Sequence, residues 1–72
     1  MTIEKQLGMR IRYLRTSQYL SIEDLALQAE VNKNYLSDLE RGTRNPSLKV
    51  ISRIAKALKI SVSELTKGIE EF

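Results

Sequence analysis

Between Ile22 and Glu40, apolar residues recur at helical spacing in two short groups that are separated by a gap. The first group has the spacing of one helix face and consists of Ile22, Leu25, Ala26 and Ala29. Leu36 and Leu39 form the second group, and Val31 lies in the gap, where it can cover a turn. This pattern predicts a helix-turn-helix, in which two short helices are joined by a turn of about three to four residues.

Apolar stripes elsewhere in the chain predict three more helices. The N-terminal stripe indicates a helix of about four turns and consists of Ile3, Leu7, Ile11 and Leu14. A later stripe indicates a fourth helix and consists of Leu48, Ile51, Ile54, Ala55 and Leu58. Val62 and Leu65 then face inward from a short fifth helix. No segment alternates as a strand does, so the predicted fold is all-α and compact, with the helix-turn-helix in its second and third helices.

Polar residues, glycine and proline mark the ends of these helices. The residues that precede the second to fifth helices are of the types that cap helix N-termini, namely Ser21, Asn32, Ser47 and Ser61. Gly42 is placed to end the third helix, and Pro46 predicts an extended connection over residues 43–47. Gly8 lies inside the first helix, where it weakens the helix unless another backbone comes close.

The free face of the third helix is polar near its N-terminus. Lys33, Asn34 and Ser37 project from it, and donors on the first turns of a rigid helix have the geometry that enters a DNA major groove. We therefore predict that these side chains contact bases, the alternative being that they are ordinary exposed residues and that Asn34 helps to cap the helix. Asp38 can accept a hydrogen bond from cytosine, although pairing with Arg41 three positions later is favoured.

The net charge is +3, but its distribution along the chain is uneven. Residues 16–32 carry three acidic and no basic residues, whereas residues 33–59 carry seven basic and two acidic ones. Positive charge gathered after the predicted recognition helix indicates contact with DNA phosphates. The candidates surround the end of the third helix and the start of the fourth: Arg41, Thr43, Arg44, Asn45, Ser47 and Lys49.

The composition excludes several classes of site. The chain has no cysteine and no histidine, so disulfides, thiol chemistry and ordinary zinc sites are excluded. We find no pairing of a nucleophile with a base, and we predict no catalytic residue, no cofactor, no metal site and no small-molecule effector. No apolar run approaches the ~20 residues of a membrane span, and no signal peptide is evident, so we expect a cytoplasmic protein.

Over about residues 7 to 66, the chain resembles the Cro/C1-type (Xre) helix-turn-helix family of DNA-binding regulators. The most specific matching segments are Tyr35-Leu36-Ser37, Leu39-Glu40-Arg41-Gly42 and Arg44-Asn45-Pro46-Ser47-Leu48. The resemblance implies a five-helix, lambda-repressor-like fold that binds double-stranded DNA in a sequence-specific manner. Restriction–modification controller proteins and phage repressors of this type are possible counterparts. The resemblance also places Arg15 and Glu40 in a buried ion pair that positions the third helix.

Three positions depart from the pattern of the family. Ile22 stands where members often have a glutamine that touches phosphate, so that contact should be lost. Tyr19 and Glu30 stand where glycine is common. If either residue has a left-handed backbone, the strain costs about 1–2 kcal/mol.

Residues 1–72 are expected to form one small domain, whose core alone is marginal at this size. A single helix-turn-helix also contacts too few base pairs for specific binding, so we expect a homodimer. The candidate interface lies in the fifth helix and the tail over residues 67–72, and consists of Ile60, Val62, Leu65, Ile69 and Phe72. The alternative is a frayed terminus. A second possible function is an antitoxin-like module that neutralises a protein partner and binds DNA secondarily.

Overall fold

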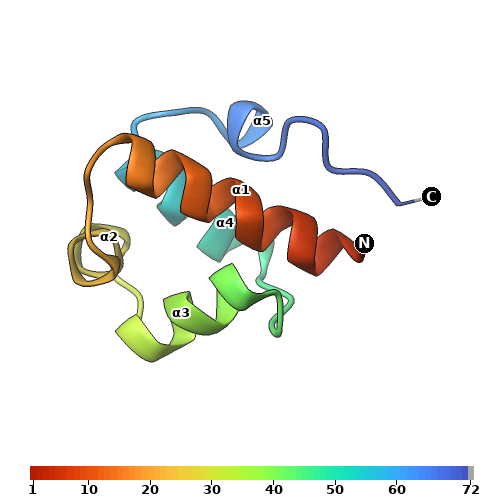
Figure 1. Cartoon of the computed structure of the whole chain (residues 1–72). Coiled ribbons are helices and arrows are strands. Elements are labelled where there is room, and N and C mark those ends of the chain that lie inside the picture. Colours follow the sequence, from red (N-terminus) through yellow and green to blue (C-terminus); the bar gives the residue numbers. More distant parts are fainter. Residues whose placement is uncertain (72) are drawn as a thin grey trace.

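The computed structural model describes residues 1–71 of the chain (Figure 1), and within them it contains five helices and no strand. The helices are α1 (Ile3–Ser17), α2 (Ile22–Ala29), α3 (Lys33–Arg41), α4 (Leu48–Ala57) and α5 (Val62–Leu65). This arrangement confirms the predicted all-α fold with the helix-turn-helix in α2 and α3. No helix in the described part of the chain is both long enough and apolar enough to cross a membrane.

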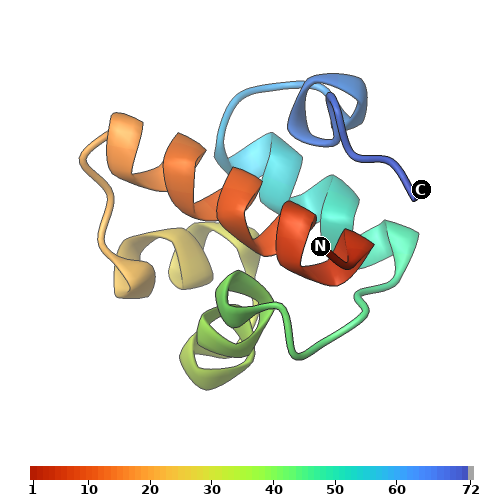
Figure 2. The same ribbon diagram turned by 45° about the vertical axis from the view of Figure 1, so that its right-hand side comes forward.

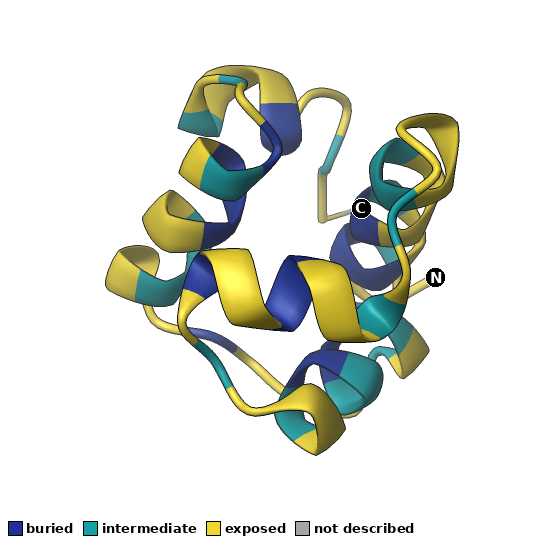
Figure 3. Ribbon diagram, turned by 90° about the vertical axis from the view of Figure 1, so that its left-hand side faces the viewer, coloured by how far each residue is buried: buried dark blue, intermediate teal, exposed yellow. Residues whose placement is uncertain are grey.

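The helix α1 runs through the middle of the molecule. It contacts α3 on one side, while α2 packs against both α3 and α4, and α4 packs against α5. In Figures 1 and 2, α3 and α5 lie on opposite sides of α1. Buried positions lie on the inner faces of the helices and exposed positions on the outer faces (Figure 3). The buried apolar residues come from all five helices and from the turn after α4: Leu7, Ile11, Leu25, Ala26, Ala29, Leu36, Leu39, Ile54, Ala55, Leu58 and Leu65.

Two residues of the predicted stripes are exposed, namely Ile3 at the start of α1 and Leu48 at the start of α4. Leu48 is 71% exposed, so its assignment to the inner face of the fourth helix is wrong. Its position as the first residue of α4 explains the difference, because α4 packs on the core through the residues that follow, of which Ile54 and Ala55 are buried.

The predicted N-caps are present at α2 to α5. The Ser21 hydroxyl oxygen accepts a hydrogen bond from the backbone N–H of Asp24 at 2.9 Å, and the Asp24 carboxylate accepts one from the backbone N–H of Ser21 at 3.1 Å. The bonds from the Ser21 backbone and hydroxyl hold the pKa of Asp24 below its ordinary value, because they favour the charged carboxylate. Asn32, Ser47 and Ser61 likewise accept from the backbones of α3, α4 and α5.

Two glycines are required by the close approach of α1 and the C-terminal end of α3. A Cβ atom on Gly8 would lie only 2.4 Å from the carbonyl oxygen of Leu39 and 2.5 Å from that of Glu40. Gly42 ends α3 with a left-handed φ of 80°, and a Cβ there would lie 2.8 Å from the Cα of Lys5. The backbones of α1 and α3 therefore touch, and this contact is the condition under which a glycine inside α1 is tolerated.

The ends of three other helices have left-handed residues that are not glycine. Tyr19 after α1 has φ of 59°, Glu30 after α2 has φ of 57°, and Lys59 after α4 has φ of 61°. The left-handed backbone considered for Tyr19 and Glu30 is thus present at both residues, whereas the one at Lys59 was not foreseen. Each such residue carries a Cβ where the backbone favours glycine or asparagine.

We predict that Glu30→Gly raises the free energy of unfolding by up to about 1 kcal/mol, because relief of strain exceeds the entropy gained by the unfolded chain. Urea unfolding measures this change. Glu30→Ala is the matched control, since it removes the same charge but keeps the Cβ, and it should give no such gain. A loss of stability in Glu30→Gly would contradict the strain at this position.

Candidate nucleic-acid interface

The N-terminal part of α3 presents polar side chains to solvent. Lys33 and Asn34 are exposed, and Ser37 is half-buried one turn later. The Lys33 ammonium lies 3.7 Å from a carboxylate oxygen of Glu23 on α2, and both side chains are more than half exposed, so this pair is weak. Lys33 is therefore available to another partner.

Asn32, rather than Asn34, caps α3. The Asn32 side-chain oxygen accepts hydrogen bonds from the backbone N–H groups of Asn34 at 2.8 Å and Tyr35 at 3.3 Å. The side-chain amide of Asn34 makes no hydrogen bond within residues 1–71. It retains both a donor and an acceptor, as bidentate contact with adenine requires.

The C-terminal end of α3 carries a cluster of three charged side chains. The Asp38 carboxylate accepts hydrogen bonds from the guanidinium groups of Arg41 and Arg44, the latter at 3.4 Å. The Arg44 guanidinium also lies over the ring of Tyr35, 5.6 Å from its centre. The pairing with Arg41 was expected. The contacts of Arg44 were not expected, because Arg44 lies six positions after Asp38 and only the turn at Gly42 brings the two together.

The remaining phosphate candidates lie along the same stretch of chain. The Thr43 hydroxyl donates to the Asp38 carbonyl at 3.1 Å and so closes the end of α3. Asn45 and Lys49 are exposed. Ser47 is also exposed, and its hydroxyl oxygen accepts from the backbone N–H of Val50 at 3.2 Å, so it caps α4.

Arg15 of α1 and Glu40 of α3 form a two-point ion pair. The Arg15 Nε lies 2.7 Å from Glu40 Oε2, and Nη2 lies 3.0 Å from Oε1. Only 13% and 7% of the two side chains are exposed. A third bond runs from Arg15 Nη1 to the carbonyl oxygen of Leu20, at 2.8 Å. The hydrogen bonds that Arg15 donates to Glu40 raise the pKa of Arg15 above its ordinary value, because they favour the charged guanidinium.

The candidate interface residues are more buried than the sequence suggested. Leu65 is fully buried in the core, so its assignment to a dimer interface is wrong. Ile60, Val62 and Ile69 are half-buried and pack against the core. Phe72 lies outside the described residues.

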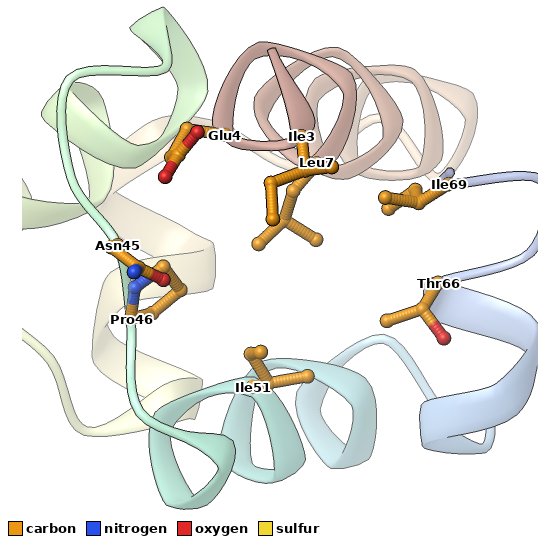
Figure 4. Close-up of a pocket in the computed structure, with 8 residues that line it drawn as sticks. All are labelled: Ile3, Glu4, Leu7, Asn45, Pro46, Ile51, Thr66 and Ile69. Carbon is orange, nitrogen blue, oxygen red and sulfur yellow. The ribbon is translucent and has the colours of Figure 1, made fainter. Parts of the chain in front are cut away.

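The tail after α5 folds back onto α1. The Gln6 side chain donates to the Glu70 carbonyl at 2.7 Å and accepts from the Glu70 N–H at 3.0 Å. Arg10, one turn further along α1, donates to the Glu64 carbonyl at 2.9 Å. Ile69 thereby lines a cavity of about 140 Å³ with Ile3, Leu7 and Ile51, among others (Figure 4). Ile69 therefore packs against its own domain and does not belong to a frayed terminus.

Comparison with known proteins gives consistent matches. A family model described as Helix-turn-helix matches residues 11–65. The control protein C.BamHI of Bacillus amyloliquefaciens is 42% identical over 59 residues, which are 81% of this chain and 73% of that protein. The HTH-type transcriptional regulator DdrOP3 of Deinococcus deserti is 43% identical over 61 residues, or 85% of this chain. Because the match covers 47% of DdrOP3, the chain spans about half the length of that relative.

Solved structures agree with the sequence matches. The crystal structure of the restriction-modification controller protein C.AhdI from Aeromonas hydrophila superposes with a TM-score of 0.84 at 42% identity, over 86% of this chain and 94% of that one. The clp gene regulator ClgR from Corynebacterium glutamicum superposes with a TM-score of 0.87 at 29% identity, over 90% and 69% of the two chains.

Proposed function

This chain belongs to the helix-turn-helix family of DNA-binding transcriptional regulators, which are not enzymes, and we propose that it binds a pseudo-palindromic operator as a homodimer, with α3 in the major groove. The observation that carries the proposal is the polar N-terminal face of α3, which is exposed while the opposite face is buried through Leu36 and Leu39. A helix presented in this way matches the width of the major groove.

Base contacts are assigned to Lys33, Asn34 and Ser37. The exposure of Lys33 and the unpaired amide of Asn34 support this assignment. Lysine donates to the acceptors of guanine, asparagine pairs with adenine, and serine suits several bases. Asp38 remains a fourth candidate, and its base contact would require the loss of one or both arginine partners.

Phosphate contacts are assigned to the segment that leaves α3 and enters α4. Its members are Arg41, Thr43, Arg44, Asn45, Ser47 and Lys49. Arg41 and Arg44 are 66% and 56% exposed, so the DNA backbone can reach both guanidinium groups. Such contacts supply affinity and orientation for any sequence, whereas the base contacts supply specificity.

A two-fold homodimer is proposed because one α3 helix spans only a few base pairs. Two copies would place their helices on half-sites about 34 Å apart. Ile60, Val62 and Ile69 are the remaining described candidates for the interface, and each keeps part of its side chain accessible. The neighbouring charges are acidic, which supports a position of this surface away from DNA.

Base and phosphate contacts have different consequences when removed. On an operator selected from a random duplex pool, Asn34→Ala should cost about 1–3 kcal/mol and relax the preference at one base pair. Arg44→Ala should weaken binding to all sequences and reduce the salt slope by about one. Binding titrations at several salt concentrations distinguish the two effects.

The matched control for Arg44→Ala is Lys56→Ala, which removes one positive charge from an exposed site on α4 outside the proposed interface. It should leave the salt slope close to that of the wild type. Equal and sequence-independent losses in Asn34→Ala and Arg44→Ala would contradict the assignment of Asn34 to base contact.

The dimer is tested by analytical ultracentrifugation at micromolar protein. We expect Val62→Glu to dissociate the dimer, because a charge would be buried at an apolar contact. Ser63→Glu adds the same charge at the neighbouring exposed position and should leave the dimer intact. A chain that ends at Lys67 shows how much the tail contributes to dimerisation. A monomeric wild type would contradict the proposal, and a dimer unaffected by Val62→Glu and by the truncation would place the interface elsewhere.

A further inference from the structure

We propose that Asp38 is a specificity-determining residue, which weakens binding to non-cognate DNA by occupying Arg41 and Arg44 in the free protein. The proposal rests on the DNA-binding function proposed above. Its basis is the position of one carboxylate between two guanidinium groups that otherwise face solvent. The Asp38 side chain is 24% exposed, against 66% for Arg41 and 56% for Arg44.

The turn after α3 builds this arrangement. The Thr43 backbone N–H and the Thr43 hydroxyl both donate to the Asp38 carbonyl, each at 3.1 Å. The left-handed Gly42 reverses the chain, so that Arg44 Nε comes back to Asp38 Oδ2. The Arg44 guanidinium also lies over the ring of Tyr35. A straight helix would not bring residues 38 and 44 together, because only positions three or four apart are neighbours on its surface.

The Asp38 carboxylate makes the binding free energy of every DNA complex less favourable. A phosphate that binds Arg41 or Arg44 must compete with Asp38, and the negative charge of Asp38 also repels the DNA backbone. Non-specific binding comes almost entirely from phosphate contacts, so this cost removes a large part of it. Specific binding also includes base contacts, and these do not compete with Asp38 for Arg41 and Arg44.

Only the correct base sequence can offset this loss of binding free energy, because only there does Asp38 find a new hydrogen-bond donor. When phosphates have taken Arg41 and Arg44, the Asp38 carboxylate is left without its partners beside the bases. A cytosine N4 amino group in the major groove supplies a donor to it, whereas the acceptors of guanine or thymine do not. An unpaired carboxylate at such an interface is unfavourable, so discrimination arises through a penalty on wrong sequences as well as through contacts to the right one.

The experiment compares binding to the selected operator with binding to a scrambled duplex of equal length, over a series of salt concentrations. Asp38→Asn removes the charge at nearly constant shape. We expect it to tighten binding to the scrambled duplex by about three- to tenfold at low salt and to steepen that salt slope by about one, because one more phosphate contact becomes free. Operator affinity should change less, so the ratio of the two affinities falls.

Two further variants control for charge and for folding. Glu64→Gln changes the net charge equally, but Glu64 lies on α5, on the far side of α1 from α3 (Figure 1). It should leave both affinities near wild type. Asp38→Glu keeps the charge and should keep the wild-type salt slope. Circular dichroism should show every variant folded, since exposed ion pairs contribute little to stability.

The outcomes separate the two proposals. If Asp38→Asn behaves like Glu64→Gln, the inference is overturned while the DNA-binding function stands. If Asp38→Asn loses affinity for the operator and keeps its affinity for the scrambled duplex, Asp38 only contacts a base and does not compete with phosphates for Arg41 and Arg44. A wild-type chain that binds neither duplex overturns the proposed function itself, and with it the role of Asp38.

Discussion

The contact between α1 and α3 is the constraint on which the rest of the structure depends. At Gly8 the two backbones come so close that no side chain fits between them. Along the same pair of helices, Arg15 holds Glu40 by two hydrogen bonds and also bonds to the Leu20 carbonyl, so one guanidinium joins α1, α3 and the turn before α2. A buried ion pair of this kind adds little net stability, but it accepts only one geometry. It therefore sets the orientation of α3 rather than the strength of the fold.

The orientation of α3 divides the proposed interface into two parts with different tasks. The N-terminal turns present Lys33 and Asn34, whose side chains have no strong partner in the described chain. The C-terminal turn and the loop after it present Arg41 and Arg44, which share the carboxylate of Asp38. Specificity is thus assigned to the first part and affinity to the second, and Asp38 links them because it stands between the base-contacting face and the arginines.

The features that were predicted from the sequence are those that depend on local chemistry. Apolar periodicity located the five helices, and Ser21, Asn32 and Gly42 marked helix ends because a side-chain oxygen or a left-handed turn is needed there. The features that were missed depend on packing between distant segments. Nothing near Lys59 indicates a left-handed backbone, Arg44 reaches Asp38 only through a turn, and Ile69 is placed by hydrogen bonds between Gln6 and Glu70 across 64 positions of the chain. The Arg15–Glu40 pair was expected only from the family resemblance, since no spacing rule connects two residues on different helices.

The most direct test of the central claim is the operator affinity of Gly8→Ala under conditions where circular dichroism shows the variant to be folded. The added methyl group must push α3 away from α1, so we expect the folded variant to lose about tenfold or more in operator affinity, as when a base contact is lost, and to keep its affinity for scrambled DNA. Ser17→Thr is the control, because it adds a methyl group to the same helix at an exposed position outside both the proposed DNA interface and the proposed dimer interface. A folded Gly8→Ala variant that binds the operator as tightly as the wild type would contradict the claim that the α1–α3 contact sets the geometry of recognition.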